Sequence, residues 1–143
     1  MNLGVYLEKK KGRAVNKIGK NKTIRECVDM LNEKKVGALI VTDDSGNVEG
    51  IISGKDVLIK GLPILDKSLS EIMTPKSKMI TSDTSENIID VMKKINDNRI
   101  RHMPVVDKGE IIGIVSIGDV IKELLDINIA ENEQLKRYIH SQY

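Results

Sequence analysis

The feature that most constrains this chain is an internal duplication. The segment GIISGKDV at residues 50–57 recurs as GIVSIGDV at residues 113–120, with five of eight positions identical. Each copy is a short apolar run that passes through Ser to an Asp three residues later, a pattern typical of a buried strand that leads directly into a helix. Upstream, Ile24 corresponds to Ile88 at an offset of 64 residues. The chain is therefore predicted to use one folding unit twice.

Each copy predicts the order strand, helix, strand, strand, helix, which makes the fold class α+β. In the first copy we expect a strand at 14–18, a helix at 24–35 with a Thr23–Glu26 capping box, strands at 36–42 and 48–53, and a helix at 54–60. In the second copy we expect a strand at 79–81, a helix at 86–97, strands at 102–106 and 111–116, and a helix from 118 into the tail. The predicted division is a helical lead-in at 1–13, repeats at 14–61 and 78–126, a connector at 62–77 and a helical tail at 127–143.

Composition excludes several functional classes. The chain has 143 residues, enough for one shared core, whereas each repeat alone would be marginal. A net charge of +2, with no Phe or Trp, argues against a nucleic-acid binder. The single cysteine, Cys27, cannot form an internal disulfide and falls on the apolar face of its helix, which favours a packing role. With no apolar run long enough for a membrane span, we expect a soluble cytoplasmic protein.

The two ends carry helical patterns with different implications. Lys9, Lys10 and Lys11 precede Gly12, which indicates the end of a helix over residues 3–11 rather than a nucleic-acid patch. The tail has apolar positions as far as Ile139, and the polar interruption at 126–133 predicts a bend or a second helix. This apolar face needs a partner, either the N-terminal helix or another subunit.

The strand-to-helix corners hold the candidate chemistry. Ser116 and Asp119 could be no more than a helix cap. The same geometry also suits a nucleotide, because amides and a hydroxyl bind phosphate while a carboxylate accepts the hydroxyls of a ribose. Arg101 and His102 open the neighbouring strand, where cations would suit phosphate oxygens. A catalytic role for His102 is the alternative, but no nucleophile set, metal-ligand spacing or glycine-rich phosphate loop accompanies it.

The stretches EKKVGALIVTDDSGNVEGIISGKDV and NDNRIRHMPVVDKGEIIGIVSIGDV resemble a pair of cystathionine-β-synthase (CBS) domains. The resemblance covers residues 14–126, and the whole arrangement is similar to small stand-alone bacterial CBS-pair proteins. It implies two β-α-β-β-α repeats packed as one module about a pseudo-twofold axis. It also implies inter-repeat clefts for adenosine compounds, and commonly a homodimer.

By position in that family, the resemblance implies roles for individual residues. Asp119 and Asp56 would hold ribose hydroxyls, Ser116 and Ser53 would face phosphate, and Arg101 and His102 would neutralise it. The walls around the adenine would come from Asn16, Lys17, Ile80, Thr81, Gly37, Ala38, Met103 and Pro104. Lys122, three residues after Asp119, matches a basic position common in relatives, whereas the first copy has Ile59 there. We therefore expect the Asp119 site to bind better than the Asp56 site.

The resulting hypothesis is a non-catalytic regulatory module that binds an adenine nucleotide. AMP is the first expectation, with ADP, ATP or NAD(H) as alternatives, and S-adenosylmethionine is a further ligand of the family. No metal is expected. The expected partners are a second copy of the chain and an unidentified effector protein, with no nucleic acid and no membrane. The alternatives are a scaffold or interaction protein with unoccupied clefts and, third, an enzyme that acts on nucleotides.

Overall fold

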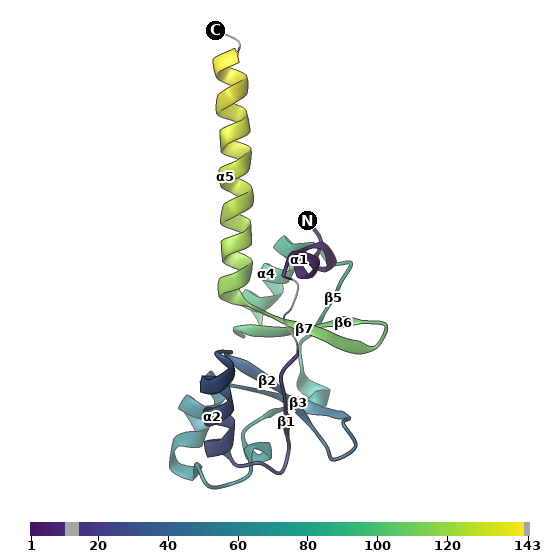
Figure 1. Cartoon of the computed structure of the whole chain (residues 1–143), viewed down its shortest axis with the longest axis vertical. Coiled ribbons are helices and arrows are strands. Elements are labelled where there is room, and N and C mark those ends of the chain that lie inside the picture. The colour runs from purple at the N-terminus through teal and green to yellow at the C-terminus, as the bar shows by residue number, and fades with distance from the viewer. Residues whose placement is uncertain (11–14, 142–143) are drawn as a thin grey trace.

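The computed structural model describes residues 1–10 and 15–141, and its elements follow the predicted order twice (Figure 1). The first repeat comprises β1 (Lys17–Gly19), α2 (Ile24–Lys34), β2 (Ala38–Thr42), β3 (Val48–Ser53) and α3 (Gly54–Asp56), which continues as a π-helical turn (Val57–Gly61). The second comprises β5 (Ser82–Asp83), α4 (Ile88–Asp97), β6 (His102–Asp107), β7 (Glu110–Ser116) and α5 (Ile117–Ser141). Helix α1 (Leu3–Lys9) precedes them, and β4 (Thr74–Pro75) lies in the connector between short 3₁₀ turns.

The two repeats form separate sheets with the same topology. β1 pairs parallel with β2, which pairs antiparallel with β3, and β4 adds an antiparallel edge. In the second sheet β5 pairs parallel with β6, which pairs antiparallel with β7. The parallel pair in each sheet is joined through α2 or α4, as a crossover connection requires.

The duplication extends to backbone irregularities that sequence comparison cannot show. Both hairpins shift register at the same place, between Val41 and Thr42 and between Val105 and Val106. Both repeat helices are followed by a non-glycine residue in the left-handed region, Lys35 at φ 54° and Arg99 at φ 53°. Such positions are uncommon for residues with a Cβ, so their recurrence indicates a constraint inherited by both copies.

Each repeat has its own apolar core, and each core is completed by the segment that precedes the other repeat. Leu69 and Ile72 of the connector lie in the first core. Leu3 and Tyr6 of α1 lie in the second core, although α1 comes before the first repeat in the chain. Isolated β-bridges join the same pairs of segments. Asn2, before α1, pairs with Asn87 of the second repeat, and Ser68 of the connector pairs with Thr23 of the first repeat.

Several local predictions are confirmed. Thr23 accepts from the Glu26 amide at 3.1 Å, and Glu26 accepts from the Thr23 amide at 3.5 Å, which completes the capping box. Cys27 is fully buried; burial and the nearby charge of Asp56 raise the pKa of its thiol to about 11. A packing role fits this environment, since a protonated thiol is a poor nucleophile.

Two predictions are wrong. The strand expected at 79–81 lies at Ser82–Asp83 instead, because pairing with β6 begins at Ser82 and the Thr81 carbonyl accepts from Lys94. The bend expected at 126–133 does not occur, because α5 is one continuous helix and this stretch contains neither Gly nor Pro. Of the predicted helix at the N-terminus, Lys11 and Gly12 lie outside the described residues.

No helix in the described part of the chain is both long and apolar enough to cross a membrane.

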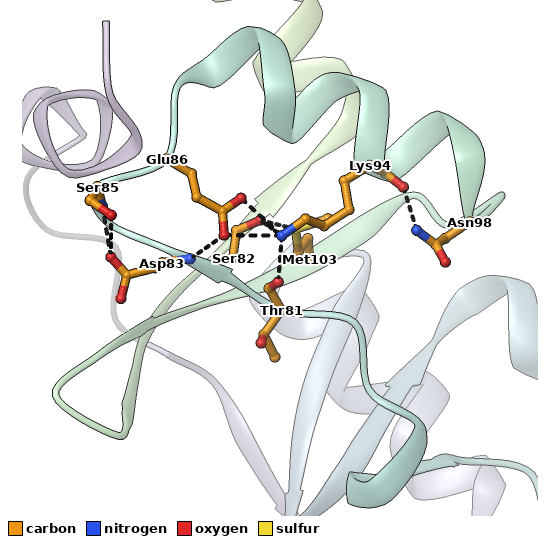
Figure 2. A network of polar contacts seen from close by, with 8 residues as sticks. All are labelled: Thr81, Ser82, Asp83, Ser85, Glu86, Lys94, Asn98 and Met103. Atoms are coloured by element: carbon orange, nitrogen blue, oxygen red, sulfur yellow. Dashed lines mark hydrogen bonds and ion pairs between the residues drawn. The ribbon is translucent and has the colours of Figure 1, made fainter.

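A polar network joins α4 to the start of the second sheet (Figure 2). The Lys94 ammonium donates to the Thr81 carbonyl at 3.0 Å, to Ser82 Oγ at 3.2 Å and to both oxygens of Glu86 at 2.9 and 3.0 Å. Glu86 also accepts from the Asp83 amide. The half-buried ammonium therefore has four acceptor atoms for its three N–H protons, so at least one proton is shared between two acceptors.

This network predicts that Lys94→Met destabilises the protein by about 1–3 kcal/mol, because a carbonyl, a hydroxyl and a carboxylate lose their common donor. Lys93→Met is the matched control, since Lys93 is the preceding residue of α4 and its side chain is exposed. Urea denaturation followed by circular dichroism measures both variants. Equal stability of the two would show that the network contributes nothing net.

Candidate functional site

A cleft of about 600 Å³ lies between the two repeats, within the size range of small-molecule sites. It is walled by α1, the residues around β1, the α2–β2 junction, β6, β7 and the start of α5. Six of the predicted residues line it: Asn16, Gly37, Ala38, His102, Ser116 and Asp119. The cleft is therefore built by both repeats.

The corner between β7 and α5 forms one end of the cleft. Ser116 Oγ accepts from the Asp119 amide at 3.1 Å, and the Ile117 amide donates to the Arg101 carbonyl at 2.8 Å. These bonds fix the start of α5, and the Ser116 hydroxyl retains a proton that it can donate to a ligand. Asp119 lies one turn into the helix and lines the same cleft.

The equivalent corner of the first repeat is arranged as a helix cap. Asp56 Oδ2 accepts from the Ser53 amide at 2.9 Å and from Ser53 Oγ at 3.1 Å. The Asp56 amide in turn donates to Ser53 Oγ at 3.4 Å, so both residues form a reciprocal capping box. Among the described residues, neither Ser53 nor Asp56 lines the cleft.

Gly37 of the first repeat lies against His102 of the second, and both line the cleft. A Cβ placed on Gly37 would overlap the Nε2 and Cε1 atoms of the His102 imidazole. A side chain at residue 37 would therefore require this ring to move, so glycine leaves room for the imidazole where it lies.

Burial controls the ionisation of His102. Desolvation lowers the pKa of its imidazole below the ordinary value, and Arg101 lowers it further, whereas Asp119 acts in the opposite direction. The His102 Nδ1 atom is buried and has no hydrogen-bond partner within residues 1–10 and 15–141. The ring is thus neutral near pH 7, with one buried nitrogen that a ligand or water can satisfy.

Cations surround the mouth of the cleft. Lys34 and Lys35 at the end of α2 and Lys10 at the end of α1 line it together with Asp119, so the described lining holds three cations and one anion. The Lys10 ammonium lies 5.8 Å from the centre of the Tyr6 ring, which is itself buried and also lines the cleft. This arrangement attracts an anionic group.

The remaining predicted residues lie elsewhere. Arg101 and Lys122 are exposed and, in the part of the chain that is described, do not line this cleft. Met103 and Pro104 are buried within β6, and Ile80 packs against the second core. Lys17 and Thr81 line a separate hollow of about 570 Å³, which the β2–β3 and β6–β7 hairpins enclose.

Sequence reasoning missed the contribution of α1 and of the α2 terminus. The lining residues not predicted are Tyr6, Leu7, Lys10, Val15, Lys34, Lys35, Val36, Ile112, Gly113 and Ile114. Lys34 and Lys35 lie three and two residues before Gly37, so their place at the site could have been found from the chain. The place of Tyr6 depends on packing between α1 and the second repeat, for which the sequence carries no local signal. No group of three or more metal-binding side chains occurs among the described residues.

With this geometry in view, comparison with known proteins establishes the family. The CBS domain profile matches residues 13–63 and 69–126, so the chain belongs to the CBS domain family. The mitochondrial CBS domain-containing protein CBSX3 of Arabidopsis thaliana is 32% identical over 127 residues, which cover 85% of this chain and 62% of that protein. The chain thus spans less than two thirds of that relative's length.

Two solved structures with the same fold contain adenosine compounds. The CBS domain pair of protein MJ0100, in complex with 5′-methylthioadenosine and S-adenosyl-L-methionine, has a TM-score of 0.74 and 26% identity, and covers 90% of this chain and 98% of that one. CBSX2 in complex with AMP has a TM-score of 0.69 and 25% identity, and covers 89% and 98%. The predicted α+β tandem CBS pair is therefore confirmed.

The lowered pKa of His102 predicts a pH-dependent stability. Between its folded value and the ordinary value near 6.5, the unfolded chain binds more protons, so stability falls as the pH drops through this window. In His102→Gln, the loss of stability that is due to protonation of His102 is absent. Melting temperatures between about pH 7.5 and pH 5.5 measure the difference. His140→Gln, on the exposed part of α5, is the control and should keep the wild-type slope.

Proposed function

We propose that this chain is a non-catalytic regulatory module whose inter-repeat cleft binds an adenosine nucleotide. The observation that carries the proposal is the convergence of Ser116 and Asp119 with His102 and Gly37 in one cleft from both repeats. The adenosine compounds bound by MJ0100 and CBSX2 support the same class of ligand.

In this proposal Asp119 accepts hydrogen bonds from the ribose hydroxyls, and Ser116 donates to a phosphate oxygen. The buried Nδ1 of His102 is satisfied by the ligand or by a water that the ligand holds. Asn16, Gly37 and Ala38 form the wall for the base. The Asp56 corner is not proposed as an equivalent site, because its carboxylate caps α3.

The charge of the lining narrows the ligand class. Three lysines at the mouth favour a phosphate-bearing compound, so AMP, ADP, ATP and NAD(H) are preferred over S-adenosylmethionine, whose sulfonium and ammonium groups are cationic. AMP remains the first candidate. The module is proposed to pass ligand occupancy to a separate effector protein by a shift in conformational population. A cytoplasmic location and a homodimer remain predictions.

The second candidate function is a scaffold or interaction protein in which Ser116 and Asp119 act only as helix caps. The capping box at Ser53 and Asp56 favours it, because it demonstrates that this motif can serve stability alone. A thermal-shift panel of adenosine compounds distinguishes the two functions. A ligand at a hundred times its Kd stabilises a protein by about 2.7 kcal/mol, whereas the scaffold would shift with none of them.

Asp119→Asn tests the ribose contact while it preserves the shape of the side chain. We expect AMP affinity to fall at least about tenfold, since hydrogen bonds to a charged acceptor contribute about 1.5–3 kcal/mol each. Isothermal titration calorimetry measures the affinity. Asp126→Asn, on an exposed position of the same helix, should bind AMP as the wild type does. Unchanged affinity in Asp119→Asn would refute the assignment of the site.

The double variant Lys34→Gln/Lys35→Gln tests the preference for phosphate. We expect AMP to bind roughly threefold to tenfold more weakly, because two cations near the phosphate are lost, while the affinity for uncharged adenosine stays the same. The wild-type preference for AMP over adenosine should also shrink as salt rises. Lys22→Gln, whose partner is the exposed Glu26, is the control. An equal loss for AMP and adenosine would contradict a role in phosphate binding.

A further inference from the structure

The distal part of α5 packs against no other element of residues 1–10 and 15–141. From Asn128 to Ser141 every residue is exposed, and the helix extends away from both repeats (Figure 1). Its first turns pack on the second core through Ile117, Val120 and Leu124, and Glu123 pairs with Lys9 of α1. Helices of about 12–15 residues are marginal in water without packing, so this extension requires a contact that a single chain does not supply.

Four exposed apolar residues of α5, together with two asparagines, follow a heptad repeat. Ile121, Asn128 and Leu135 recur every seven residues, and Leu125, Asn132 and Ile139 form a second series four residues later. These are the d and a positions of a coiled coil, and they include four large apolar side chains that are 40–59% exposed. We call the a and d positions the seam. The buried Val120 and Glu123 lie on a different face of the helix, so the seam stays exposed while α5 contacts the second repeat.

We propose that α5 pairs in parallel with α5 of a second copy of this chain, as a two-stranded coiled coil over residues 121–139. The polar stretch within the helix then has a role. Asn132 falls at an a position, where asparagines from the two chains can bond to each other and fix the register and the two-stranded state.

The residues that flank the seam select the parallel orientation. In a parallel pair, a g position meets the e position five residues later in the partner helix. Glu131 then meets Lys136 of the second copy. In the antiparallel alternative, Glu131 would face Glu131 and Lys122 would face Lys136, so like charges would meet. Charge complementarity therefore favours the parallel pair.

An ion pair within α5, between Lys136 and Glu133, competes only weakly with the contact between Lys136 and Glu131 of the second copy. Within residues 117–141, Lys136 lies 3.9 Å from Glu133, and both side chains are more than half exposed. Such a surface pair contributes little, so Lys136 can turn to Glu131 of the second copy at small cost.

Sedimentation equilibrium of the whole chain tests the dimer. We expect the wild type to form a dimer that Leu135→Asp dissociates, with no change in the melting of the repeats, because Leu135 makes no buried contact in its own chain. Gln134→Asp, at the adjacent position outside the seam, is the control and should remain dimeric. A monomeric wild type, or a dimer that Leu135→Asp leaves intact, would overturn the proposal.

Charge reversal and cross-linking test the orientation. In a parallel pair Lys136→Glu should weaken the dimer roughly fivefold to tenfold, and Glu131→Lys/Lys136→Glu should restore it. In an antiparallel pair Lys136→Glu would strengthen it. Asn132→Cys should form a covalent dimer on mild oxidation, whereas the wild type should not, because its only cysteine, Cys27, is buried. Failure of Asn132→Cys to cross-link a dimeric protein would exclude the parallel register.

Discussion

The structure depends on the exchange of lead-in segments between the two repeats. Leu3 and Tyr6 complete the core of the second repeat, while Leu69 and Ile72 complete the core of the first. Burial of a large apolar side chain contributes about 1.5–3 kcal/mol, so removal of either segment would open a core that is already small. The core of each repeat is therefore incomplete without the segment that precedes the other repeat in the sequence. The two repeats thus fold as one module.

The same exchange builds the cleft. Since α1 packs on the second repeat, it brings the Tyr6 ring and Lys10 to a cavity whose other walls are the α2–β2 junction and β7. The repeats also meet between Gly37 and His102, where a larger residue at position 37 would displace the imidazole. The chemistry of the cleft thus follows from packing between segments that are distant in sequence.

The parts of the structure that sequence could predict are those set by local signals. The apolar strands, the Thr23–Glu26 cap and the turns before Val48 and Glu110 required only neighbouring residues, and the duplication supplied the order of elements. The place of α1 could not be predicted, because the spacing of its apolar residues does not indicate which of the two repeats it packs on. The Lys94 network explains the displaced strand: one amine holds the Thr81 carbonyl, so pairing begins at Ser82. Of the candidate site, the motif residues of the second repeat were found. Lys34 and Lys35 could have been found from their nearness to Gly37, whereas the place of Lys10 depended on the tertiary packing of α1.

The two copies of the motif show how one sequence pattern can serve stability at one corner and line a cleft at the other. The strand before Ser53 is covered by β4, whose Thr74 carbonyl leaves no space for a side chain on Gly50. The equivalent Gly113 instead faces the side chain of Leu7, and it lines the cleft. The connector therefore pairs with the strand that leads into the first corner, where the Asp56 carboxylate accepts from the Ser53 amide. Because α1 covers the second corner with side chains rather than with a paired strand, a cleft forms beside Ser116 and Asp119, and the asymmetry of the module arises from its lead-in segments rather than from the motif itself.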